Sequence, residues 1–124
     1  MSKSSLTDLL PANVWFFPDA LEDFLALDRS RQIMVLKALH KIASGPSQFG
    51  KPLGNQQDRH LAGFRSAYVD RKSIRIVWRV ADDGRVEVAV IAAILEREGM
   101  EVYETAAKRR EVLDRWLRAK LAGA

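Results

Sequence analysis

Hydrophobic residues in the first third of the chain predict a short strand followed by two helices. Residues 14–17 form an apolar run of strand-forming residues, and Pro18 ends it. Apolar residues then recur at helical spacing over residues 19–28 and again over residues 30–44. In the second helix the apolar members are Ile33, Leu36, Leu39, Ile42 and Ala43. Gly45 and Pro46 then form a typical helix stop.

The second half of the chain predicts three antiparallel strands. Residues 46–59 are rich in Gly, Pro and amide side chains and read as a loop. Strands are expected at residues 61–70, 73–80 and 85–95, with turns at Arg71-Lys72 and at residues 82–84. In the middle strand, apolar residues alternate with a set that carries cations: Ile74, Ile76, Trp78 and Val80 alternate with Arg75, Val77 and Arg79. This predicts a buried side and a basic side of the sheet, whereas residues 85–95 are apolar in both alternate sets and predict a strand covered on both faces.

The C-terminal part predicts a further helix, at about residues 98–122. Residues 100–122 contain neither Pro nor Gly, and this helix either packs on the core or pairs with another chain. Residues 1–12 read as a loose arm or a short helix. With 124 residues in all, the expectation is a single domain spanning residues 1–124, of class α+β.

Composition excludes several kinds of site. The chain has no Cys and only two His, so we expect no disulfide, no metal site and no cofactor. It shows neither an export signal at its N-terminus nor a run of about 18 apolar residues. We therefore expect a cytoplasmic protein that does not associate with membranes.

Positive charge is concentrated in the middle of the chain. Residues 29–79 contain eleven Lys and Arg but only two acidic residues, although the whole chain has a net charge of only +4. The cations of the second helix suit an ordinary solvated face. A second group lies on two adjacent predicted strands and favours a polyanion-binding surface: Arg65, Arg71, Lys72, Arg75 and Arg79.

Three segments, in this order, resemble the RelE/ParE toxin superfamily over roughly residues 13–110. They are Lys51-Pro52-Leu53-Gly54, the strand SIRIVWRV at 73–80, and REGMEVY at 97–103 with the following Ala106, Ala107 and Arg109. The resemblance implies the toxin of a type II toxin-antitoxin system, with a cognate antitoxin as partner. Members of the RelE branch are ribosome-dependent endoribonucleases that cleave messenger RNA, whereas ParE members inhibit DNA gyrase without chemistry of their own. We favour the RelE branch; the ParE branch and a non-toxic family member remain alternatives.

The RelE resemblance also implies site residues. It carries over three catalytic positions, which are Arg75, Arg97 and Tyr103. The family's two strand lysines fall on Ser66 and Tyr68, which is a departure from the pattern. We expect RNA binding to involve the nearby cations and one aromatic side chain: Lys51, Arg65, Tyr68, Arg71, Lys72 and Arg79.

These residue types suit cleavage of RNA without a metal. The 2′-hydroxyl attacks its own phosphate, so one group must accept a proton and others must neutralise the phosphorane. Arginine suits the phosphorane because its fork donates two hydrogen bonds and stays charged. We assign that task to Arg75 and Arg97, and proton acceptance to Tyr103, while His60 is a weaker candidate for general acid. The alternatives are surface ion pairs for the arginines and core packing for the tyrosine.

Overall fold

The computed structural model describes residues 6–56, 59–69, 71, 73–96 and 101–123. A 3-10 helix η1 (Leu6–Leu9) precedes a first strand and two α-helices, and a long α-helix ends the chain. The elements that follow η1 are β1 (Val14–Phe16), α1 (Pro18–Leu25), α2 (Arg29–Ala43), β2 (Lys51–Pro52), β3 (Asn55–Gln56), β4 (Arg59–His60), β5 (Phe64–Val69), β6 (Ile74–Asp82), β7 (Glu87–Leu95) and α3 (Glu101–Gly123).

One five-stranded sheet, in the order β1-β7-β6-β5-β2, organises the molecule. Strands β5, β6 and β7 form the predicted antiparallel meander, and β1 pairs parallel with β7. The predicted α+β order of strand, two helices, three strands and C-terminal helix is confirmed. The segment at 46–59 is more than a loop, because β2 pairs with β5 and the short β3 and β4 pair with each other.

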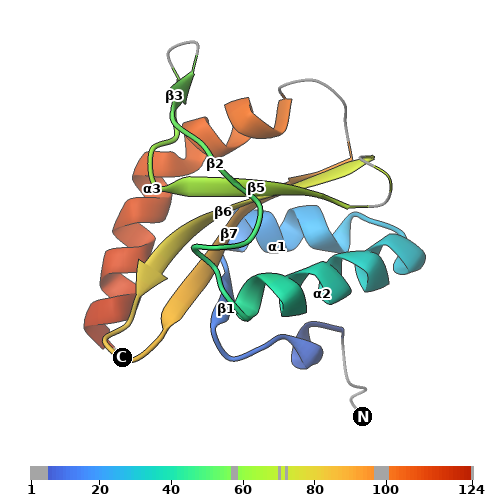
Figure 1. The fold of residues 1–124 in the computed structure, drawn as a ribbon, viewed down its shortest axis with the longest axis horizontal. Coiled ribbons are helices and arrows are strands. Elements are labelled where there is room, and N and C mark those ends of the chain that lie inside the picture. The colour runs from blue at the N-terminus through green and yellow to red at the C-terminus, as the bar shows by residue number, and fades with distance from the viewer. Residues whose placement is uncertain (1–5, 57–58, 70, 72, 97–100, 124) are drawn as a thin grey trace.

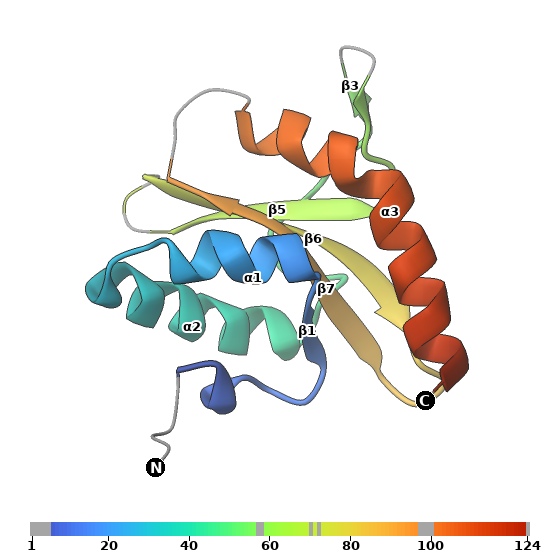
Figure 2. The same cartoon turned by 180° about the vertical axis from the view of Figure 1, so that it is seen from behind.

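Helices cover both faces of this sheet. Helices α1 and α2 lie side by side on one face, here called the α1/α2 face, and α3 crosses the other, the α3 face (Figures 1 and 2). Strand β7 is sandwiched between them, with every residue from Val88 to Ile94 buried. The prediction of a strand covered on both faces is therefore confirmed.

Helix α2 begins at an Asp28 cap and buries a stripe slightly different from the predicted one. The Asp28 carboxylate accepts a hydrogen bond from the Arg31 backbone N–H at 2.9 Å. This hydrogen bond is the largest of the effects that lower the pKa of Asp28. The buried residues are Val35, Leu36, Leu39 and Ile42. Ile33, which we expected in the core, is 40% exposed, because the contacts of α2 with the sheet turn Val35 inward instead.

The predicted buried and basic sides of β6 are both present, but α3 covers part of the basic side. Trp78 lies in the core, as predicted, and its Nε1–H donates to the Pro46 carbonyl at 3.0 Å. On the opposite side Val77 is also fully buried, and Arg79 forms an ion pair with Asp114 of α3. Strand alternation distinguishes two faces, but it cannot show that a distant helix packs on the second one.

An ion pair covers the edge of β7 beyond the end of β1. The register of β6 with β7 shifts after Val77, so that Ala92 is skipped in the pairing. The Ala92 carbonyl accepts a hydrogen bond from Arg109 of α3 at 2.8 Å, and the Ile94 N–H donates to Asp23 of α1 at 3.1 Å. Arg109 also donates to both oxygens of Asp23, at 2.8 and 3.2 Å. Asp23 and Arg109 thus join α1, α3 and the uncovered strand edge.

The two ends of the described chain pack on the rest of the molecule. His40 Nε2 of α2 lies 2.9 Å from the Leu9 carbonyl, so η1 is held against α2. In α3, Leu113 and Leu117 are buried and Trp116 meets Phe17 edge-on, so this helix packs on the chain's own core. Among the described helices, none is both long and apolar enough to span a bilayer.

Candidate functional site

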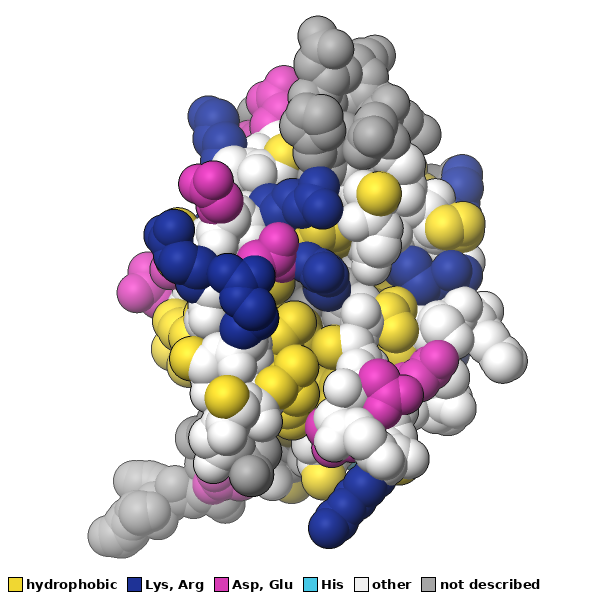
Figure 3. All heavy atoms as spheres, turned by 90° about the vertical axis from the view of Figure 1, so that its left-hand side faces the viewer, with side chains coloured by type: hydrophobic (Ala, Val, Ile, Leu, Met, Phe, Trp, Pro, Cys, Tyr) yellow, Lys and Arg dark blue, Asp and Glu magenta, His cyan; other side chains and the backbone are white. Residues whose placement is uncertain are grey.

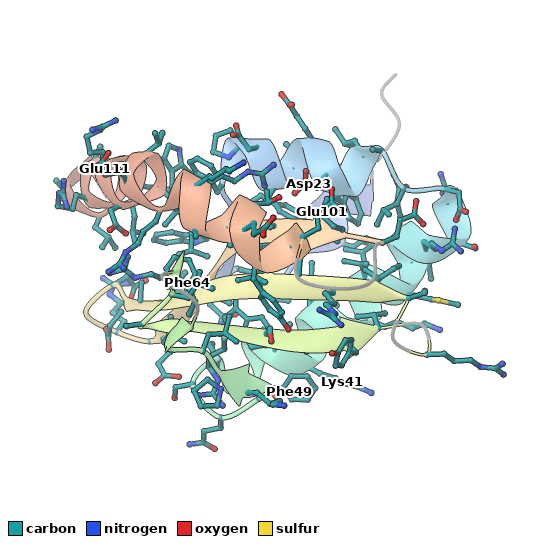
Figure 4. All side chains as sticks on the ribbon, turned by 90° about the horizontal axis from the view of Figure 1, so that it is seen from above. Asp23, Lys41, Phe49, Phe64, Glu101 and Glu111 are labelled. Carbon is teal, nitrogen blue, oxygen red and sulfur yellow. The ribbon has the colours of Figure 1, made fainter. Side chains whose placement is uncertain are left out.

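An open pocket of about 350 Å³ lies where the first turns of α3 approach β5 and the loop before β2. Its lining residues come from the loop before β2 and from the four elements β2, β5, β6 and α3: Phe49, Gly50, Lys51, Ser66, Ala67, Tyr68, Arg75 and Tyr103. Figure 4 shows this region from above, with Glu101 at the start of α3 and Phe49 on the side of the β2 edge. Two of the three predicted catalytic residues, Arg75 and Tyr103, therefore line one pocket although they are distant in sequence.

The guanidinium of Arg75 is stacked against two tyrosine rings. Arg75 and Tyr68 are directly opposite residues of β6 and β5, and the guanidinium carbon lies 4.6 Å from the Tyr68 ring centroid. Tyr103, in the first turn of α3, has its ring centroid 5.4 Å from the same carbon. Stacking of this kind is attractive and restricts the plane of the guanidinium. The pocket thus contains a cation in contact with two aromatic rings.

Ser66 provides a polar group next to Tyr103. It faces α3 two residues before Tyr68, is only 6% exposed, and its Oγ lies 3.5 Å from the Tyr103 hydroxyl. The position that the resemblance associates with a family lysine is therefore occupied by a buried hydroxyl. This hydroxyl lies next to the phenol that the sequence analysis proposes as the proton acceptor.

The loop wall of the pocket is held tightly against the sheet. Arg65 lies on the face of β5 opposite Ser66 and Tyr68, and its guanidinium donates to the carbonyls of Phe49 at 2.8 Å and Gly50 at 3.2 Å. Gly50 has φ 71°, and a Cβ atom there would lie 2.4 Å from the Ser66 carbonyl oxygen and 2.7 Å from the Trp78 ring. Only glycine permits this close approach.

Lys51 carries the pocket's ammonium group. It is exposed on β2 and is the direct neighbour of Ser66 across the β2–β5 pair. Positive charge therefore reaches this part of β5 from the adjacent strand. None of the eight lining residues is acidic, so the pocket favours an anion.

The other predicted site residues that the structure describes do not line this pocket. Arg65 binds the loop carbonyls, and Arg79 pairs with Asp114 and lies 5.7 Å from the Phe64 ring centroid. Arg71 is exposed at the β5–β6 turn, with φ 55°. Arg97, Lys72 and the His60 side chain lie outside the described residues.

Positive charge does not continue uniformly onto the outside of α3. Along the helix, Glu104 precedes Lys108 and Glu111 precedes Arg115 by four residues, a spacing typical of a solvated helix face. Figure 3 shows Lys and Arg interleaved with Asp and Glu on the face it presents. The described residues also contain no group of three His, Cys, Asp or Glu that could hold a metal.

Phe49 and Gly50 are pocket residues that sequence reasoning missed. The sequence shows Gly50 only as one of several loop glycines, although its backbone lies too close to the Ser66 carbonyl and the Trp78 ring for any side chain. Phe49 is a large aromatic residue in an otherwise polar loop. That contrast is the one signal that singles it out.

We predict that Gly50→Ala loosens the pocket wall. The substitution adds a Cβ clash with backbone and places alanine at a positive φ, so we expect a loss of about 1–3 kcal/mol in the free energy of unfolding. Gly54→Ala is the matched control, because no atom lies within 4 Å of the added Cβ. Denaturant unfolding measures both variants, and equal stability of the two would contradict the prediction.

Comparison with known proteins gives structural relatives only. No protein-family model and no curated protein sequence matches this chain. The solved structure of the isolated E. coli RelE toxin matches with TM-score 0.56 and 22% identity, covering 77% of this chain and 95% of that one. A free E. coli RelE mutant with two arginines changed to alanine matches with TM-score 0.61 and 21% identity, covering 77% and 94%. The RelBE2 toxin-antitoxin complex of Mycobacterium tuberculosis matches with TM-score 0.55 and 27% identity, covering 71% and 93%.

Proposed function

We propose that this chain, which has the fold of the RelE toxins, is the toxin of a toxin-antitoxin pair and cleaves messenger RNA on the ribosome. The observation that carries the proposal is the pocket in which the Arg75 guanidinium lies over the rings of Tyr68 and Tyr103, with Lys51 also in the lining. An oriented guanidinium beside a phenol is a suitable arrangement for an RNA phosphodiester and the hydroxyl next to it.

The proposed reaction is attack of a ribose 2′-oxygen on the adjacent phosphorus. The bond from phosphorus to the 5′-oxygen breaks, which leaves a 2′,3′-cyclic phosphate and a 5′-hydroxyl. In its phenolate form Tyr103 accepts the 2′ proton, and the departing 5′-oxygen takes a proton from water. Arg75 binds the phosphate oxygens, whose negative charge increases in the transition state, and Lys51 adds charge from β2. Arg97 is proposed as a second arginine for the phosphorane.

Positioning by the ribosome explains why so few groups suffice. Holding the 2′-oxygen, phosphorus and leaving oxygen in line removes much of the entropic part of the barrier. The antitoxin is proposed to bind this chain and block the pocket, in keeping with the solved RelE neighbours that contain an antitoxin or a peptide of one.

The test is to map messenger RNA ends by primer extension after brief expression of the parent chain and of Tyr103→Phe. We expect discrete 5′ ends in phase with codons for the parent and none for the variant, which keeps the ring and loses only the hydroxyl. Intact messages together with DNA breaks would contradict the proposal and favour a gyrase inhibitor. Intact messages with normal growth would favour a non-toxic protein.

Affinity for single-stranded RNA is predicted to fall with salt. If Arg75 and Lys51 each neutralise one phosphate, log K should decrease with log salt with a slope of about −1.4, or about sevenfold between 50 and 200 mM. Lys51→Ala should reduce the magnitude of that slope by about 0.7. Titrations by fluorescence anisotropy measure this, and an affinity independent of salt would exclude phosphate contacts at the pocket.

A further inference from the structure

Two aromatic side chains of the pocket, Phe49 and Tyr68, supply no group that transfers a proton or binds the phosphorane in the proposed cleavage, although the Tyr68 ring contacts Arg75. Phe49 comes from the loop before β2 and Tyr68 from β5, and both line the same pocket. The aromatic residues that form the core, such as Phe24, Phe64 and Trp78, are at most 1% exposed, whereas Tyr68 is 44% exposed. Packing of the core therefore does not account for the position of Tyr68.

Both rings are attached to firmly held parts of the structure. The Phe49 N–H donates to the Gly45 carbonyl at 3.0 Å, and the Phe49 carbonyl accepts from Arg65 at 2.8 Å. The Tyr68 ring lies against the Arg75 guanidinium at 4.6 Å, within a paired strand. Because these positions are fixed before a ligand arrives, little ordering of the protein opposes binding.

The chemistry of the lining indicates which ligand fits this pocket. A simple phosphate ion needs only cations, and Phe49 and Tyr68 would contribute nothing to its binding. Unpaired nucleobases stack on aromatic side chains, and their phosphates pair with neighbouring lysine or arginine. The pocket combines these features, with Lys51 and Arg75 next to the two rings in a volume of about 350 Å³.

We infer that Phe49 and Tyr68 form a stacking subsite for one unpaired base of a single-stranded RNA whose phosphate lies at Arg75 and Lys51. The inference rests on the proposed function in taking RNA as the substrate, and it adds that this chain selects an unstacked base at the cleavage site. Tyr68, at the position where the resemblance implies a lysine, then binds through its ring where a lysine would bind through charge.

The test uses the full chain and a six-nucleotide RNA that carries 2-aminopurine and 2′-O-methyl groups, which prevent cleavage. Stacking of 2-aminopurine on an aromatic ring quenches its fluorescence, so we expect quenching on binding to the parent. Phe49→Leu and Tyr68→Leu should each lose most of the quenching and weaken binding by roughly 5- to 150-fold. Tyr68→Phe keeps the ring and should retain both properties.

Trp15→Leu is the matched control, because Trp15 is a half-buried aromatic residue of β1 that does not line this pocket. Melting temperatures verify that each variant is folded. Binding without quenching, or leucine variants that bind as tightly as the parent, would overturn the inference. Quenching without any message cleavage in cells would support the stacking subsite and refute the nuclease activity. Message cleavage by the parent, together with leucine variants that bind and quench as the parent does, would support the nuclease activity and refute the subsite.

Discussion

Replacing Arg75 with alanine is expected to reduce message cleavage by about 100- to 1,000-fold, the cost of removing one fixed donor from the transition state. The guanidinium is the charged group that both tyrosine rings orient, and no second described arginine lines the pocket. Single-turnover cleavage on programmed ribosomes measures the chemical step directly.

Arg75→Lys is the informative companion variant. It retains one positive charge but loses the planar fork and its stacking on Tyr68, so we expect only a small recovery of the rate. Both variants should bind the antitoxin and melt close to the parent. Cleavage by Arg75→Ala within threefold of the parent would remove Arg75 from the mechanism.

Replacing Arg109 with alanine is expected to have the largest effect on folding, with a loss of about 3 kcal/mol in the free energy of unfolding. Asp23 and Arg109 side chains are only 12% and 18% exposed, and the substitution leaves the Asp23 carboxylate without its main partner. It also removes the donor to the Ala92 carbonyl at the strand edge. Urea unfolding followed by tryptophan fluorescence measures the change.

Two further variants isolate the cause. Arg115→Ala, on the exposed side of the same helix, should change stability by no more than about 0.5 kcal/mol. The double variant Asp23→Asn with Arg109→Met should lose less stability than the two single changes added together, because neither charge is then left alone. A loss of less than about 1 kcal/mol for Arg109→Ala would show that the pair is not a structural link.

Arg75 and Arg109 both belong to segments that resemble the RelE/ParE superfamily, but the two side chains have different roles in this structure. Arg109 follows the segment at 97–103 in the sequence and binds α1 and β7, far from any phosphate contact in the proposal. Arg75 is the second residue of β6 and lines the pocket. Loss of activity in an Arg109 variant should therefore follow its loss of folded protein, whereas loss in an Arg75 variant should not.

The order and type of the longer elements followed from the sequence because they depend on local periodicity and on local stop signals. The 3.6-residue period of α2, the Gly45-Pro46 stop and the Asp82-Asp83-Gly84 turn act within a few residues of one another. Strand alternation also predicts that Arg65 and Tyr68 lie on opposite faces of the sheet, since residues three apart on a strand face opposite sides.

Packing between distant segments decided the rest. Helix α3 covers Val77 and pairs with Arg79. The loop before β2 brings Phe49 to the same pocket as Tyr68, and Arg65 binds the carbonyls of that loop. Each of these contacts joins residues at least 15 positions apart, and it depends on how whole elements dock rather than on the residues nearby in sequence. The sequence by itself therefore determined the first strand, the three-stranded meander, the α-helices and the charges they carry. Only the tertiary structure decided the short strands β2, β3 and β4 and which of those charges remain accessible, because strand pairing and burial are properties of the docked elements together.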